Sequence, residues 1–161
     1  MRNNLIVDLG LYASIDEMLT TLRNKKCSVT FRTDSLLRRH EEDIINGDEK
    51  ESVHLRVLDP KDVGLVCDAR PRYVWERAHK KFGLQPCPLL TASYLFLQHS
   101  DELQEDENVH VISTSEDIEG VLSVSIMHNF ETWFLCVVEF GEYRRSGMHS
   151  LKKNKFAFAM P

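Results

Sequence analysis

A chain of 161 residues has the usual length of one domain and can bury a core without a metal or disulfide staple. Its net charge of −5 disfavours a general nucleic-acid binder, and its longest apolar run, residues 133–138, is far shorter than the ~20 residues of a membrane-spanning helix. Because the apolar start at residues 5–7 stops at Asp8, too early for a secretory signal, we expect one cytoplasmic domain over residues 1–161 with no membrane contact.

Two helices are predicted in the first third of the chain. Ser14 and Glu17 form a capping-box pattern ahead of apolar residues at helical spacing, so the first helix covers about residues 14–24. Residues 27–31 look extended. Asp34 is expected to cap a second helix, which Gly47 would end.

The middle of the chain predicts one strand and two further helices. Apolar and polar residues alternate over residues 53–57, which is typical of a strand with one buried face. Pro71 fits the first turn of a helix over residues 71–82, with Gly83 in the left-handed position after it. Residues 89–97 are apolar on several sides, and we expect a short helix there that straightens near Tyr94.

The last third changes to β-branched and aromatic runs separated by turn-rich pieces. Strands are predicted over residues 109–113, 121–128, 133–140 and 155–159. The predicted fold class is therefore α+β, with helices mostly in the N-terminal half packed on a mainly antiparallel sheet from the C-terminal half. The aromatic final strand is also similar to the C-type-lectin-like architecture, which we keep as the alternative fold.

The familiar enzyme motifs are absent from the sequence. It contains no phosphate-cradling GxxxxGK[ST], no GxGxxG, no HExxH and no GxSxG, and its four cysteines form no CxxC pair. Cys67 lies beside Arg70 at the expected start of a helix, where a thiol can have a lowered pKa and act as a nucleophile, with His79 further along that helix. A packed, unreactive cysteine is the alternative interpretation.

Two histidines are candidates for a catalytic or metal site. His110 and His128 each fall on a predicted strand, and an acidic run precedes His110. Adjacent strands would have to bring them together, because no single element fixes a ligand spacing. A surface or edge position is the favoured interpretation of both, so we predict no metal and no cofactor.

A basic loop near the C-terminus is the best candidate for a binding surface. An aromatic ring lies among cationic side chains there, a combination that contacts phosphates or stacks on bases. Its candidate binding residues are Tyr143, Arg144, Arg145, Lys152 and Lys153. The alternative is an exposed loop whose lysines guard a sheet edge against pairing.

One stretch of the chain carries a family resemblance. Its residues are Gly64-Leu65, then Phe82-Gly-Leu-Gln-Pro-Cys-Pro88, then Ala92, Leu95, Leu97 and Gln98. This pattern resembles a family of small uncharacterised bacterial proteins, in which a helix ends in Gly-Leu and Cys-Pro before an apolar stretch ending in Leu-Gln. Pro86 and the basic loop depart from that pattern. The resemblance implies a bacterial or phage setting and a two-layer α+β fold, and it implies no activity.

The favoured function is a non-catalytic binding or accessory module that engages another macromolecule, with a protein preferred to a nucleic acid. Its motivation is an uneven charge distribution without a complete catalytic set. Two alternatives stay open. One is a small enzyme with a site assembled from Cys67, His79, His110 or His128, and the other is a nucleic-acid binder that uses the C-terminal basic loop.

Overall fold

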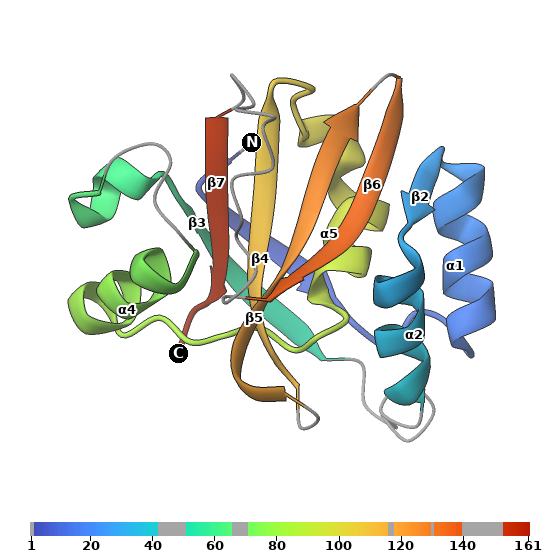
Figure 1. Ribbon diagram of the computed structural model, residues 1–161, viewed down its shortest axis with the longest axis horizontal. Coiled ribbons are helices and arrows are strands. Elements are labelled where there is room, and N and C mark those ends of the chain that lie inside the picture. Colours follow the sequence, from blue (N-terminus) through green and yellow to red (C-terminus); the bar gives the residue numbers. More distant parts are fainter. Residues whose placement is uncertain (1, 42–50, 66–70, 116–117, 130, 140–152) are drawn as a thin grey trace.

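The computed structural model describes residues 2–41, 51–65, 71–115, 118–129, 131–139 and 153–161 (Figure 1). Helices and strands alternate irregularly along the chain in these ranges. The α-helices are α1 (Ile15–Asn24), α2 (Phe31–Arg39), α4 (Pro71–Phe82) and α5 (Thr91–His99), with short 3₁₀ turns η1 (Pro60–Val63) and η2 (Ser100–Glu102). The strands are β1 (Asn4–Asp8), β2 (Cys27–Val29), β3 (Ser52–Leu58), β4 (Glu107–Ser115), β5 (Ile118–Asn129), β6 (Thr132–Glu139) and β7 (Lys153–Ala159).

The described strands form one mixed sheet in the order β1-β3-β7-β4-β5-β6-β2. Neighbouring strands run antiparallel except for the β4–β7 and β2–β6 pairs, which are parallel. The α+β class and the mainly antiparallel sheet are thereby confirmed. The sheet also takes in β1, β2 and β3 from the first half of the chain, so the two halves are less separate than the residue patterns suggest. The lectin-like alternative stays a prediction.

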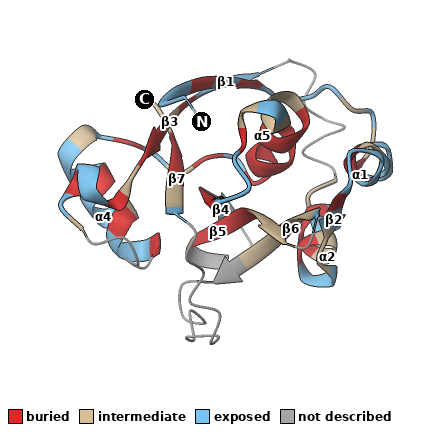
Figure 2. Ribbon diagram, turned by 90° about the horizontal axis from the view of Figure 1, so that it is seen from above, coloured by how far each residue is buried: buried red, intermediate tan, exposed pale blue. Residues whose placement is uncertain are grey.

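The sheet is strongly curved and wraps around α5 (Figure 2). The first seven residues of α5 are all buried, which is the pattern of a helix enclosed on every side. The helix continues to His99, so the expected straightening near Tyr94 is wrong. Enclosure explains this, because a backbone surrounded by apolar side chains must satisfy its own hydrogen bonds and an α-helix does so internally.

The end of α5 also protects the free edge of β1. The Gln98 amide accepts a hydrogen bond from Asp8 N at 3.0 Å and donates one to Asp8 O at 2.6 Å, as a neighbouring strand would. His99 Nε2 lies 2.8 Å from the carbonyl oxygen of Ile6. These contacts satisfy backbone groups that an edge strand otherwise leaves open to pairing with another chain.

The bounds of α1 confirm the helix predicted over residues 14–24, whereas α2 starts earlier than predicted. Ser14 caps α1 by accepting a hydrogen bond from Glu17 N at 3.2 Å. The extended segment ends at Thr30, whose N–H donates to Leu135 O at 3.0 Å, and α2 begins at the next residue. Asp34 is therefore in the first turn and pairs with Arg38 at 3.2 Å, and the prediction that Asp34 caps this helix is wrong. The predicted stop at Gly47 lies outside the described residues.

The convex face of the sheet is covered near β3 and β7 by α4, which has the predicted bounds (Figure 1). Val74 and Ala78 on its buried side pack in one cluster with Phe156 and Phe158 of β7. Burying such an aromatic side chain contributes about 2–3 kcal/mol. Gly83 follows the helix with φ of +70°, as its position predicted. None of the described helices is long and apolar enough to span a membrane.

Candidate functional site

A cavity of about 580 Å³ opens on the convex face, where the C-terminal end of α4 meets β3. Its described lining residues come from both chain ends as well as from the middle. They are Asn3, Asn4, Arg56, Val57, Leu58, Asp62, Phe82 and Met160. The volume lies within the usual range for a small-molecule site, and the lining combines apolar walls with a few polar groups, as such sites do.

Arg56 is placed in this cavity by the alternation of β3. Val53, Leu55 and Val57 point into the main core, so Arg56 faces the opposite side, toward α4. Its guanidinium carbon lies 4.3 Å from the centroid of the Phe82 ring, which is a cation–π contact. The ring thus holds the half-buried guanidinium against the cavity wall.

A second cation meets the same ring. Lys81 Nζ lies 5.0 Å from the Phe82 centroid and donates a hydrogen bond to the backbone oxygen of Asp62 at 2.7 Å. Two positive charges therefore converge at one aromatic side chain. An anion that enters the cavity would be attracted by both charges.

One oxygen of the Asp62 carboxylate, which lines the cavity, already has a partner. Asp62 accepts a hydrogen bond from Asp59 N at 2.8 Å and completes the capping box of η1, and it forms no ion pair with Arg56. Among the described residues, none offers Arg56 an ion-pair or hydrogen-bond partner within range. An unpaired guanidinium beside an open cavity is available to bind an anion from outside the chain.

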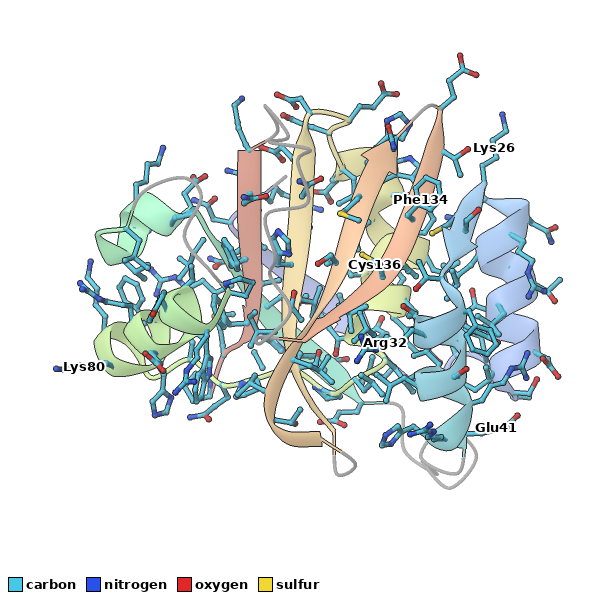
Figure 3. All side chains as sticks on the ribbon, in the orientation of Figure 1. Lys26, Arg32, Glu41, Lys80, Phe134 and Cys136 are labelled. Atoms are coloured by element: carbon cyan, nitrogen blue, oxygen red, sulfur yellow. The ribbon has the colours of Figure 1, made fainter. Side chains whose placement is uncertain are left out.

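The surface around the cavity is basic, although the chain as a whole has a net charge of −5. Apart from the Arg72–Glu76 ion pair, residues 52–65 and 71–82 contain five Lys and Arg against two Asp and Glu. Tyr73 is 53% exposed on α4, and Lys80 points away from the sheet at the end of that helix (Figure 3). This second basic surface was not predicted, because its residues are spread over a strand and a helix that are distant in sequence.

A separate polar cluster lies deeper on the same face, where β7, β4 and β5 run side by side. His110 Nδ1 lies 2.7 Å from Ser125 Oγ, and His110 Nε2 lies 3.3 Å from Asn154 Oδ1. Asn108 Nδ2 donates to the same Asn154 oxygen at 3.2 Å, and Ser123 Oγ is 3.4 Å from His110 Nδ1. The order hydroxyl, imidazole, amide is that of a nucleophile, a base and an orienting group.

The protonation of this cluster follows from its partners. Since the Asn154 oxygen only accepts, Nε2 of His110 carries the proton and Nδ1 is free to accept from Ser125. Complete burial lowers the pKa of His110 to about 4, with the Asn154 hydrogen bond opposing the shift. The ring is therefore neutral at neutral pH and is stacked on Phe156 at a centroid distance of 4.9 Å.

The cluster is closed to substrate. His110 is 3% exposed, and Ser123 and Ser125 are 0% exposed. The expectation of a surface or edge position for His110 is therefore wrong, because β4 is an interior strand between β7 and β5. We interpret the cluster as a satisfied polar network that fixes the register of three strands, since each buried group has a partner.

The other predicted catalytic candidates do not converge. His79 is exposed on α4, with Nδ1 3.0 Å from Leu84 O, and it stacks on Trp75. His128 is half-buried on β5, against Trp133 and with Glu105 3.9 Å away, and because β5 is an interior strand the expected surface or edge position is wrong for His128 too. Cys67 lies outside the described residues.

The described cysteines are poor nucleophiles. Burial raises the pKa of the Cys27 and Cys87 thiols to about 12 and that of Cys136 to about 11, so all three are protonated at neutral pH. Figure 3 shows Cys136 and Phe134 on β6. In the part of the chain that the structure describes, no group of three His, Cys, Asp or Glu side chains is arranged to hold a metal ion.

Of the predicted binding residues, only Lys153 is within the described ranges. It is exposed, and its Nζ lies 3.3 Å from Asp106 Oδ2. Four of the five residues, Tyr143, Arg144, Arg145 and Lys152, lie outside the described part of the chain. The prediction that this loop binds a partner therefore stays a prediction.

Comparisons with known proteins add no assignment. No protein-family model, no curated protein and no solved structure matches the chain.

Proposed function

We propose that this chain is a non-catalytic binding module whose ligand, or whose partner's contacting group, carries negative charge. The observation that carries the proposal is the unpaired Arg56 guanidinium, held on Phe82 in an open cavity. The basic surface of α4 around that cavity supports it, because it would attract the same kind of partner over a longer range.

A binding role fits the lining better than catalysis does. The described lining residues are amides, a carboxylate, two aromatic or thioether groups, apolar side chains and one guanidinium. None of these described residues is a hydroxyl, thiol or imidazole that could act as a nucleophile or as a base near neutral pH. The Ser–His–Asn arrangement found among the described residues is buried elsewhere.

The cytoplasmic setting expected from the sequence belongs to the same proposal. Buried, protonated thiols at Cys27 and Cys87 are compatible with a reducing compartment. A tagged copy expressed in a bacterial host would be expected in the soluble cytoplasmic fraction, and recovery from membranes would contradict this.

Titration calorimetry of the full chain with pyrophosphate tests the proposal. We expect measurable binding that weakens as salt concentration rises, because both cations are near the surface. The variant Arg56→Gln should weaken binding by at least about tenfold, the loss expected when a charged hydrogen-bond donor is removed.

The matched control is Arg72→Gln, on the solvent side of α4. Arg72 already pairs with Glu76 at 2.8 Å and does not line the cavity, so its loss should change the affinity by less than about twofold. Absence of binding, or an equal loss in both variants, would overturn the proposal.

A further inference from the structure

The guanidinium of Arg56 is a flat surface as well as a charge. Its central carbon lies 4.3 Å from the centroid of the Phe82 ring, and both residues line the cavity, so a flat group that enters the cavity can stack against this pair. Guanidinium planes and aromatic rings are the two side-chain surfaces on which nucleic-acid bases stack.

Two side-chain amides lie at the same end of the cavity. Asn4 is directly opposite Arg56 in the β1–β3 register, and Asn3 precedes it in the chain. An Asn amide offers one donor and one acceptor side by side, which matches the edge of a base and adenine in particular. Both residues are exposed, so these amides are reachable from outside.

The remaining polar groups suit the other parts of a nucleotide. Lys81 lies next to the cavity with its ammonium 5.0 Å from the Phe82 ring, where it can meet a phosphate. Asp62 uses one carboxylate oxygen for Asp59 N, which leaves the second oxygen for a sugar hydroxyl. A volume of about 580 Å³ accommodates a ligand of this size.

We infer that the anionic ligand of the Arg56 cavity is a nucleotide, whose base stacks against the Arg56–Phe82 pair while the charges of Arg56 and Lys81 attract its phosphate. This inference rests on the proposed function, since it names the chemical class that the same cavity takes. The nucleotide can be free or can be the end unit of a single strand, because both present the same base, sugar and phosphate.

Calorimetry on the full chain with pyrophosphate, ADP and a 5′-phosphorylated adenine pentanucleotide tests the inference. Stacking and edge contacts should make ADP or the pentanucleotide bind at least about tenfold more tightly than pyrophosphate. Equal affinity for ADP and the pentanucleotide indicates the free nucleotide, and tighter binding of the pentanucleotide indicates a strand end.

The decisive variant is Arg56→Lys, which keeps the charge and removes the plane. We expect its pyrophosphate affinity to stay within about threefold of wild type and its preference for ADP to disappear. Asn4→Ala, at an exposed position, should lower ADP affinity without changing pyrophosphate affinity, and it serves as the second variant if Arg56→Lys folds poorly. Arg72→Lys is the matched control and should change neither affinity.

Two failures are distinguishable. If pyrophosphate binds through Arg56 but neither ADP nor the pentanucleotide binds more tightly, the nucleotide inference is overturned and the anion-binding function survives. If none of the three probes binds, both are overturned. Retention of the ADP preference in Arg56→Lys would also overturn the stacking arrangement.

Discussion

Two polar regions on the convex face of the same sheet differ in one respect that decides their interpretation. The His110 network is fully buried, and each of its ring nitrogens has a partner within 3.3 Å. The Arg56 cavity is open, and among the described residues its guanidinium has only the face of Phe82. A satisfied buried network contributes to the fold, whereas an unsatisfied charge beside open space is available to a ligand.

The largest effect that would test this contrast is on the stability of the buried region. His110→Ala should lower the free energy of unfolding by about 4 kcal/mol, because it leaves a cavity and removes one hydrogen-bond partner from each of Ser125 and Asn154. Urea unfolding measures the loss. His54→Ala, at an exposed position on β3, is the matched control and should change stability by less than about 0.5 kcal/mol. Equal effects would show that the network is not structural.

The next effect is a pH dependence that belongs to His110. Its pKa is about 4 in the folded chain and near the ordinary value of 6.5 when unfolded, so the unfolded state binds more protons between those values. Stability should therefore fall by up to about 3 kcal/mol as pH drops from 6.5 to 4. The free energy of unfolding of His110→Gln should not show this loss between pH 6.5 and 4. Equal pH dependence in wild type and variant would contradict the assignment of the effect to His110.

A substitution in the open Arg56 cavity is expected to change the free energy of unfolding less, and any change should be an increase. Arg56→Gln should leave stability within about 0.5 kcal/mol of wild type or raise it, since it removes a cation that shares the Phe82 ring with Lys81 and lacks a described ion pair. Arg38→Gln is the comparison, because Arg38 contacts both Asp16 and Asp34 and its loss should only lower stability. A marked loss in Arg56→Gln would mean that Arg56 serves the fold.

The smallest expected effect is none at all. A fluorophosphonate probe, which labels activated serines, should leave Ser125 unmodified in the folded chain because its hydroxyl is fully buried. Intact mass and peptide mapping would detect any adduct, with a known serine hydrolase in the same tube as the positive control. Labelling at Ser125 would show that the network opens to solvent. The Ser–His–Asn arrangement would then be a candidate active site.

Local signals predicted the elements well where they act within a few residues. The capping box at Ser14 marks the start of α1, and Pro71 and Gly83 mark the start and end of α4. Such signals are reliable because caps and left-handed positions depend on the chain immediately around them. The start of α2 was missed for the opposite reason, since it is set by pairing of β2 with the distant strand β6.

The sites were much less predictable than the elements. Arg56 was visible only as a polar position in an alternating strand, and nothing in the sequence indicates that Phe82 would lie beneath it. His110 was expected on a strand, and it lies on one, but its burial depends on the strands that flank β4. Alternation assigns residues to a face and does not say what covers that face.

The sequence by itself determined the α+β class, the helices with strong caps, most of the strand positions and the absence of the familiar catalytic motifs. The tertiary structure alone decided the strand order, the curvature of the sheet around α5, the burial of His110 and the meeting of Arg56, Phe82 and Lys81. The physical reason is range. Backbone propensity and capping act over one or two turns, whereas a binding site needs charges and surfaces from segments that only long-range strand pairing brings together.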